Sequence, residues 1–163
     1  MTKIYMIAAV DEDYAIGYEN HLLFHLKDDM KQFRDKTSFK CIIMGRKTFE
    51  SLPGSKPLPK RRNIVLSKTL QSYEGVEVYA CLDDVMQAID GEEEVWVIGG
   101  ESIYRLFLPY ADGIYLTHIH QKAMHADAFF PRLDDSWHCL RRLEDRKEDG
   151  IVFHYAQYEK GTH

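Results

Sequence analysis

Residues 94–104 constrain the fold more than any other stretch of this chain, because a strand-like run ends there in two glycines and continues into a helix-like run. Residues 95–98 are apolar and mostly β-branched, which predicts a buried strand. Apolar residues after Ser102 recur at helical spacing. Gly99 and Gly100 lack a Cβ, and the first amides of a helix lack intrahelical partners. Such a turn favours a bound anion, typically a phosphate, although a tight turn without a ligand has the same pattern.

A second turn of this kind lies earlier in the chain. Residues 40–44 predict a buried strand that ends at Gly45, and a short helix is predicted at 48–52. Cationic side chains here would join the helix amides in binding an anion, unless they are ordinary surface cations. The candidate side chains are Arg46, Lys47 and Thr48, with Ser67 and Lys68 after another predicted strand.

Strands and helices alternate along most of the chain, which predicts an α/β fold with a mostly parallel sheet. Further strands are predicted at 4–10, 63–67, 76–80 and 113–120, and helices at 28–36 and 83–89. Two late strands, at 137–143 and 151–158, predict an antiparallel hairpin at one edge. Residues 11–23 predict a long loop, and a loop of that length is often functional.

Composition narrows the class of protein. The 163 residues suit a single domain, 1–163, and the net charge of −5 offers no overall basic field for nucleic acid or an anionic membrane. Three widely spaced cysteines suit a reducing compartment rather than a disulfide framework. With no signal-peptide pattern at the N-terminus and no apolar run of ~20 residues, we expect a cytoplasmic protein.

Asp29 is the first candidate for chemistry. On the predicted helix it shares a face with Met30 and Phe33, which we expect to point inward. A carboxylate held among apolar side chains must find a cation, a hydrogen-bonding ligand or a proton. The alternative is that Asp28 and Asp29 are first-turn acids that favour the helix dipole.

Other polar groups are weaker candidates. Among residues 60–62, which follow a proline-containing loop, an arginine would suit a two-pronged grip on a carboxylate, unless the loop is simply solvated. His118 and His120 share one face of a predicted strand, with Thr117 on the opposite face, and this spacing is a weak indication of zinc. The acidic runs at 92–94 and 144–149 are most simply solvated turns.

Short motifs recur over nearly the whole chain in the order of one known family. They are Ile7-Ala8-Ala9, residues 15–20, Asp29-Met30 with Phe33, residues 43–48, Pro57-Leu58-Pro59 with Arg61-Arg62-Asn63, residues 97–100, residues 115–118 and residues 127–131. Each motif is weak alone, but the series is specific. The chain resembles the dihydrofolate reductase family of the bacterial chromosomal type.

The resemblance implies a three-layer fold with roughly eight strands, an antiparallel C-terminal hairpin and about four helices. It implies NADPH-dependent reduction of 7,8-dihydrofolate to tetrahydrofolate for one-carbon metabolism and thymidylate synthesis. Hydride would pass from the nicotinamide to pterin C6, and N5 would take a proton from water. NADPH would be the cofactor, with no metal, and antifolates would bind a monomeric protein. The adenosine part would lie on residues of about 40–108.

The resemblance also implies roles for particular residues. Asp29 would hold the pterin 2-amino group and N3 with help from Thr117, and Arg61 would grip the α-carboxylate of the glutamate tail. The implied substrate site is Ile7, Ala8, Asp29, Met30, Phe33, Leu52, Leu58, Arg61, Ile98, Tyr104 and Thr117, with Leu22 and Phe24 joining Asp29 and Thr117 at the reacting ring. The implied cofactor site is Ala9, Ile16, Gly17, Asn20, Leu22, Gly45, Arg46, Lys47, Thr48, Leu66, Ser67, Lys68, Ile98, Gly99, Gly100, Glu101, Ser102, Ile103 and Tyr104.

Two departures from the family pattern bear on the site. Phe24 stands where the family often has a tryptophan, so the indole N–H that helps position a water is lost. Ala126-Asp127-Ala128 replaces Gly-Asp-Thr, which puts the hold on the nicotinamide-covering loop in question. The alternatives are a pyrimidine reductase of riboflavin synthesis on the same fold, a non-catalytic folate- or nucleotide-binding protein, and a metal-binding protein that uses His118 and His120.

Overall fold

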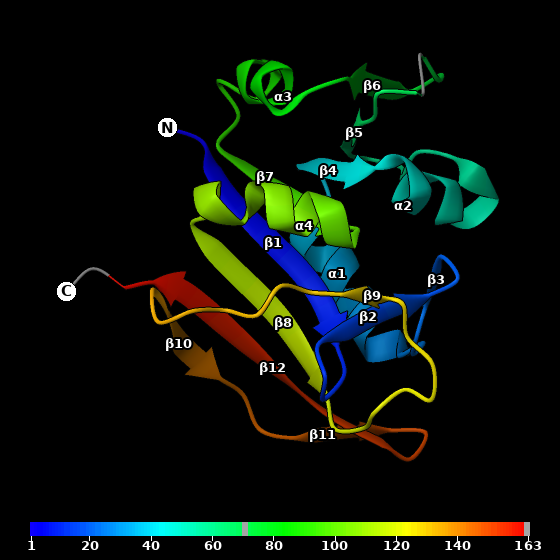
Figure 1. Cartoon of the computed structure of the whole chain (residues 1–163), viewed down its shortest axis with the longest axis vertical. Helices are drawn as coiled ribbons and strands as arrows, with labels where there is room; N and C mark the ends of the chain where they lie inside the picture. Colours follow the sequence, from blue (N-terminus) through cyan, green and yellow to red (C-terminus); the bar gives the residue numbers. More distant parts are fainter. Residues whose placement is uncertain (70–71, 162–163) are drawn as a thin grey trace.

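A long twisted sheet forms the centre of the molecule in the computed structural model, which describes residues 1–69 and 72–161 (Figure 1). Its strand order is β10 (Trp137–Arg142), β12 (Ile151–Lys160), β8 (Gly113–Ile119), β1 (Lys3–Val10), β7 (Glu94–Gly99), β4 (Cys41–Gly45), β5 (Arg62–Leu66) and β6 (Val76–Tyr79). The strands from β8 to β6 are parallel, whereas β12 and β10 are antiparallel. The predicted mostly parallel sheet with an antiparallel C-terminal edge is confirmed.

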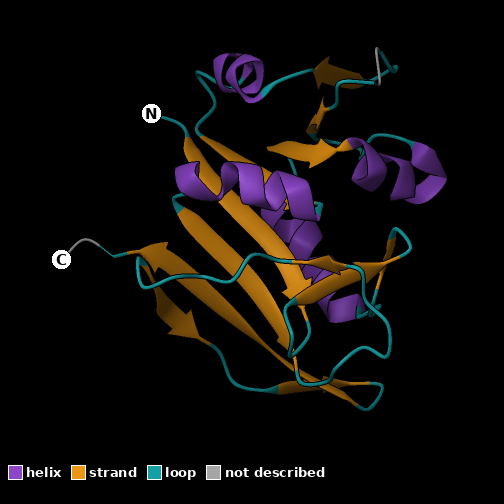
Figure 2. Ribbon diagram, in the orientation of Figure 1, coloured by secondary structure: helices purple, strands orange, loops and turns teal. Residues whose placement is uncertain are grey.

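The central strands are apolar on both faces because helices cover both sides of the sheet (Figure 2). On one face, Tyr104 and Phe107 of α4 (Glu101–Phe107) pack in one cluster with Met6 and Val10. On the other face, Phe33 of α1 (Lys27–Thr37) packs in a second cluster with Ile7 and Ile42. Two shorter helices, α2 (Arg46–Ser51) and α3 (Leu82–Ala88), complete the layers, and 3-10 turns span Pro53–Ser55 and Leu108–Tyr110.

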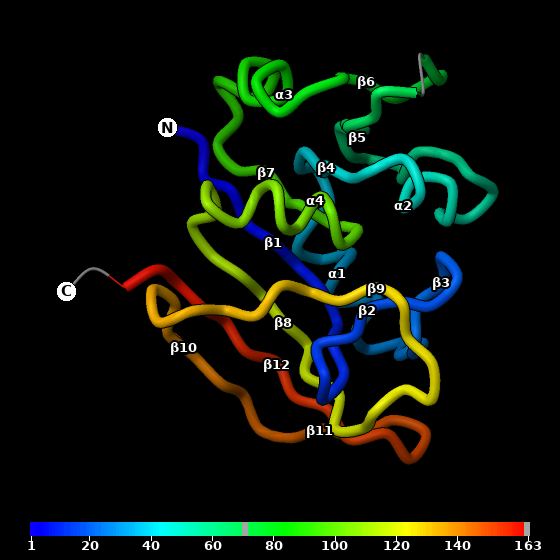
Figure 3. The backbone as a smooth tube through the Cα atoms, viewed as in Figure 1, coloured from blue at the N-terminus to red at the C-terminus, as the bar shows by residue number. Residues whose placement is uncertain are grey.

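The segment predicted as a loop at 11–23 contains a small hairpin. β2 (Ala15–Tyr18) pairs with β3 (His21–Leu22), and β2 also pairs with β9 (Ala128–Phe129) from a distant part of the chain. Figure 3 shows the two segments running side by side across the end of the main sheet. The loop prediction was therefore incomplete, because the second pairing partner lies more than a hundred residues later.

The acidic runs are also more structured than expected. Glu92 and Glu94 form ion pairs with Arg62 (2.9 Å) and Lys40 (3.2 Å), and β11 (Arg146–Glu148) pairs with β12 inside the predicted turn. Among the described residues, no helix is long and apolar enough to cross a membrane.

Candidate active site

The two predicted anion-binding turns face each other at the carboxyl ends of two interior strands of the main sheet. β4 and β7 are adjacent and parallel, so their carboxyl ends meet where α2 and α4 begin. A Cβ built on Gly45 would lie 3.0 Å from Ile103 Cγ1, and one built on Gly100 would lie 3.3 Å from Thr48 Oγ1. Gly99 has a φ of 122°, which favours glycine, and the Gly99-Gly100 peptide bond is cis. The chain thus brings two glycine turns and the first turns of two helices together.

Polar side chains surround this pair of turns. Arg46 donates from Nε to Glu50 (3.0 Å) and from Nη1 to Thr69 (2.7 Å). Leu66, Ser67 and Lys68 lie at the end of β5, the next strand, so they share the same edge of the sheet. The backbone segments that carry Arg46 and Lys68 are therefore neighbours, and the Arg46 side chain reaches Thr69.

The β2–β3 hairpin also reaches this edge. The Asn20 Nδ2 group donates to the backbone carbonyl of Lys47 (3.0 Å), which joins the hairpin turn to the first turn of α2. Asp127 holds the hairpin from the other side, since its Oδ2 accepts from the Glu19 amide (3.1 Å) and its own amide donates to the Gly17 carbonyl (3.0 Å). Asp127 thus contacts the β2–β3 hairpin, although Ala126 and Ala128 replace the glycine and threonine of the family pattern.

Asp29 projects from α1 toward β8, where it accepts a hydrogen bond from the Thr117 hydroxyl. Burial raises the pKa of the Asp29 carboxyl above its usual range, and the Thr117 hydrogen bond lowers it in part. The nearby carboxylates of Asp28 and Glu148 add to the rise in pKa. The result is a poorly hydrated acid with one neutral donor, which suits binding to a ligand rich in N–H groups.

The start of α1 is held by a segment that the sequence interpretation treated as solvent-exposed. Leu26, the residue before the helix, has no polar side chain with which to cap it. Glu148 of β11 accepts instead from the amides of Lys27 (2.7 Å) and Asp28 (3.0 Å). Asp28 in turn accepts from the Tyr155 hydroxyl (2.6 Å). The C-terminal strands therefore position the helix that carries Asp29.

Apolar side chains form the wall beside Asp29. Phe33, Leu52, Leu58 and Ile98 pack against the cluster that contains Ile7. Met30 does not join them, since it is 54 % exposed, and the expectation that it points inward was wrong. The inward stripe of α1 runs through residues 29, 33 and 37 at a spacing of four, and position 30 is turned away from it by about 100°.

Arg61 lies at the outer end of this wall. Its Nε donates to Thr37 Oγ1 (2.9 Å), its Nη1 donates to the Pro59 carbonyl (2.9 Å), and its guanidinium lies 6.0 Å from the centre of the Phe33 ring. Burial lowers the pKa of Arg61 within its strongly basic range, so it stays charged. The arginine is oriented by these contacts before any ligand arrives.

Tyr104 and the covering loop complete the surroundings. The buried Tyr104 hydroxyl donates to the Ile7 carbonyl (2.7 Å), which ties α4 to β1. Leu22 is 59 % exposed on β3, whereas Phe24 packs near Leu26 and Phe153. Leu22 and Phe24 both line a cavity of about 440 Å³ between residues 18–24 and 121–125.

The alternation along β8 separates two kinds of polar group. Thr117 faces α1 and Asp29, whereas His118, the next residue, faces the opposite side, where its Nε2 lies 2.7 Å from the Tyr158 hydroxyl. His118 and His120 therefore do not lie beside the candidate active site, as the alternation of a strand predicts.

The fold and this site define a class of α/β protein with two glycine turns at the carboxyl ends of adjacent parallel strands and a partly buried acid on a helix that covers the same sheet. The sequence model described as "Dihydrofolate reductase" matches residues 3–160. Two curated relatives bear that name. One, from Bacillus subtilis, is 40 % identical over 161 residues and covers 96 % of this chain and 94 % of its own. The other, from Haemophilus influenzae, is 41 % identical over 145 residues and covers 88 % of each.

A solved structure agrees with the sequence comparisons. Dihydrofolate reductase from Enterococcus faecalis, complexed with NADP(H) and RAB-propyl, superposes with a TM-score of 0.89 at 32 % identity and covers 98 % of this chain and 97 % of its own. The chain belongs to the dihydrofolate reductase family.

Proposed function

We propose that this chain catalyses the NADPH-dependent reduction of 7,8-dihydrofolate to tetrahydrofolate. The observation that carries the proposal is the Asp29 carboxylate, which is hydrogen-bonded to Thr117 and lies on the same helix as Phe33 of the apolar wall. The relatives from Bacillus subtilis and Haemophilus influenzae are both named dihydrofolate reductase, so the pyrimidine reductase alternative is not favoured.

For the substrate, Asp29 holds the donor pair formed by the pterin 2-amino group and N3, and Thr117 orients the carboxylate. Ile7, Ala8, Phe33, Ile98 and Tyr104 bound the pterin ring, and Leu52 and Leu58 contact the benzoyl group. Arg61, already oriented by Thr37 and Pro59, takes the α-carboxylate of the glutamate tail. Phe24 and Leu22 exclude water near the reacting ring.

The residues at the carboxyl ends of β4 and β7 fit nicotinamide adenine dinucleotide phosphate, because a side chain at Gly45 or Gly100 would fill the space between the two turns. When bound, NADPH would supply the hydride for pterin C6, and a proton from water would reach N5 to complete the reduction. Residues 45–48 and 99–103 bind the pyrophosphate, and Arg46, Lys47, Ser67 and Lys68 favour the 2′-phosphate. Ala9, Ile16, Gly17, Asn20, Leu66 and Tyr104 complete the cofactor site, and residues of about 40–108 bind the adenosine part.

The proposal extends to the whole protein. We propose that residues 1–163 form one domain, that it acts as a monomer in the cytoplasm, and that antifolates compete with dihydrofolate at the Asp29 site.

A steady-state assay with purified protein tests the activity directly. We expect loss of nicotinamide absorbance only when both dihydrofolate and NADPH are present, with much slower turnover on NADH. Turnover of an amino-pyrimidine substrate without turnover of dihydrofolate would instead identify the alternative reductase. Thr117→Val should weaken substrate binding and leave NADPH binding unchanged.

A further inference from the structure

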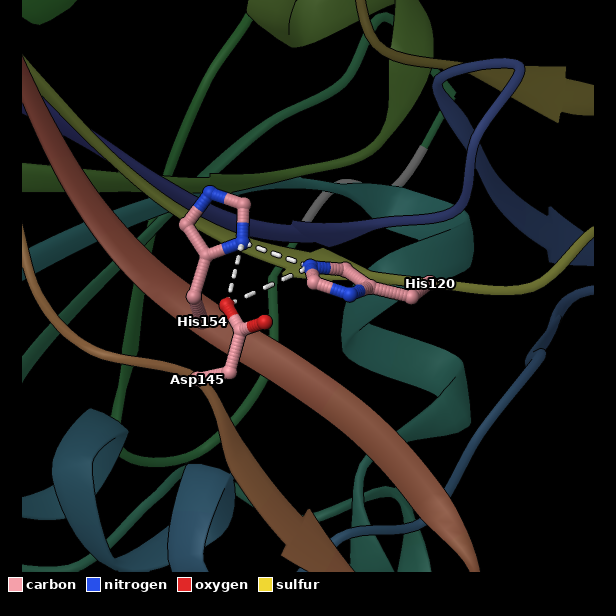
Figure 4. Close-up of side chains that lie close together, drawn as sticks. All are labelled: His120, Asp145 and His154. Carbon is pink, nitrogen blue, oxygen red and sulfur yellow. Dashed lines mark hydrogen bonds and ion pairs between the residues drawn. The ribbon is translucent and has the colours of Figure 1, made fainter.

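Two imidazoles and a carboxylate converge beside β12 (Figure 4). His154 pairs with His118 in register, so it faces the side of the main sheet opposite to Thr117 and Asp29. His120 follows β8, His154 lies on β12, and Asp145 lies between β10 and β11. His120 Nε2 and His154 Nδ1 are 2.7 Å apart, and Asp145 Oδ1 lies 3.9 Å from each nitrogen. One ligand atom from each of the three side chains thus faces a common point.

These distances are close to those of a metal site. In a tetrahedral site with bonds of about 2.0–2.1 Å, neighbouring ligand atoms lie about 3.3 Å apart. One of the observed separations is shorter than this value and two are longer, so small rotations of the side chains would equalise them. Imidazole nitrogen and carboxylate oxygen are ligands that suit Zn²⁺ and its neighbours in the first transition series.

We propose that His120, Asp145 and His154 bind a divalent transition-metal ion of the zinc type. The side chains of these residues are 32 %, 51 % and 14 % exposed, so water can reach the ion and complete its coordination. This site differs from the His118–His120 pair that the sequence suggested, and it departs from the expectation of no metal. The partner of His120 is His154, which the sequence places far away.

The surroundings orient the two imidazoles before an ion arrives. The His118 ring stacks on His154 with ring centres 4.8 Å apart and planes 18° apart, and Tyr158 holds His118 in turn. The His120 amide donates to the Val152 carbonyl (2.8 Å), which ties the backbone of His120 to β12. Contacts of this kind around the ligands strengthen metal binding because they fix the ligand geometry.

A cation already lies at the edge of this cluster. Arg142 Nη2 lies 3.1 Å from Asp145 Oδ1 and 3.5 Å from His154 Nδ1. Arg142 is 53 % exposed on β10, so it can move into solvent when an ion binds. The proton between the two imidazoles must also shift to another ring nitrogen, because both coordinating nitrogens need a free electron pair.

Titration of the purified full-length chain with Co²⁺, followed by absorption, and with Zn²⁺, followed by calorimetry, tests the proposal at neutral pH. We expect saturable binding of one ion per chain. His120→Gln and Asp145→Asn should each weaken binding by roughly tenfold or more. Arg142→Ala should strengthen it, because a competing cation is removed.

His138→Gln is the matched control, since His138 Nε2 lies 3.1 Å from Glu159 in another histidine–carboxylate pair on the same sheet. Zinc should raise the melting temperature of the wild type and of His138→Gln, but not of His120→Gln. Absence of saturable binding by the wild type would overturn the proposal, as would equal affinities in the wild type and Asp145→Asn, whose exposed position leaves the fold intact.

Discussion

The Asp29 carboxylate lowers the free energy of unfolding at neutral pH, because its charge is partly removed from water. Burial raises its pKa, and its described hydrogen-bond partner is the neutral Thr117 hydroxyl. A hydrogen bond to a poorly hydrated carboxylate is stronger than one to a carboxylate in water, so a ligand with two N–H groups should bind Asp29 tightly. The same residue should therefore aid activity and reduce stability.

Replacing Asp29 by Asn should lower kcat by about 100- to 1,000-fold, because one charged group that contacts the reacting ring is lost. Steady-state kinetics with dihydrofolate and NADPH measure the effect. Asp35→Asn, at an exposed position of the same helix, is the control and should leave kcat unchanged. A wild-type kcat in Asp29→Asn would remove Asp29 from the mechanism.

The stability of the same variant should change in the opposite direction. A carboxyl whose pKa is raised by folding is protonated more readily in the native state, so stability falls as the pH rises from the unfolded value of 3.8 through the raised native value. Asp29→Asn should therefore unfold at a higher urea concentration than wild type at neutral pH, and this advantage should shrink in acid. An equal or lower midpoint at neutral pH would contradict the assignment.

The direction of a single side chain could be predicted where the strand alternates regularly between the two faces of the sheet. The alternation of β8 correctly separated Thr117 from His118 and His120. The prediction for Met30 on α1 was wrong, because neighbouring positions on a helix point about 100° apart and the inward direction depends on what the helix packs against.

At the scale of elements, α1 depends on a cap from a distant strand. Glu148→Gln should destabilise the protein by about 1 kcal/mol, because the charged acceptor of two helix amides is weakened. It should also lower the pKa of Asp29, because a neighbouring negative charge is removed. Urea unfolding and the pH profile of kcat measure the two effects.

Glu144→Gln, an exposed change just before β11, is the control for Glu148→Gln. If both substitutions lower the free energy of unfolding equally, the loss comes from removing one negative charge and not from weakening the helix cap.

The Asn20 side-chain amide ties the β2–β3 hairpin to the first turn of α2. Asn20→Gly keeps the positive φ of 64° accessible but removes the bond from Nδ2 to the Lys47 carbonyl. We expect NADPH binding to weaken roughly twofold to tenfold, the range of one hydrogen bond, and to see faster NADP⁺ release in stopped-flow fluorescence. Unchanged cofactor binding would mean that the hairpin does not close on the cofactor.

Strands with a clear apolar pattern in their own sequence were predicted, whereas short strands without such a pattern were not. β4 and β7 are continuous apolar runs, and both were predicted within two residues of their ends. β2, β3 and β11 are short, and each is stabilised by a partner strand rather than by its own period. The cap on α1 was missed for the same reason, since it comes from the far end of the chain.

At the scale of the whole molecule, one partly buried network of ion pairs and hydrogen bonds joins β5 and β6 to the rest of the protein. Arg62 of β5 bonds to Glu77 of β6 (2.5 and 2.7 Å), to Glu92 before β7 (2.9 Å) and to the carbonyl of Ala88 in α3 (3.1 Å). Arg62→Met should lower the free energy of unfolding by on the order of 2 kcal/mol, because two carboxylates lose their partner. Arg105→Met, in an exposed pair with Glu101, should cost less than about 0.5 kcal/mol.

The Arg62 network also predicts an acid dependence. Arg62 holds the pKa of Glu77 below its usual 4.5, so the stability that the pair supplies is present above that value and is lost as the pH falls through the native pKa. Wild type should therefore lose more stability than Arg62→Met between neutral and acidic pH. Parallel pH profiles would rule out this source of stability.

Thr117 and His118 lie next to each other on β8 and face opposite sides of the sheet. Inserting or deleting one residue in β8 before Thr117 would turn both side chains to the other side of the sheet, so the Thr117 hydroxyl would no longer face Asp29. A two-residue change would restore the facing of each side chain. Variation in the length of this strand is thus confined to even steps, which ties the evolution of its two surfaces together.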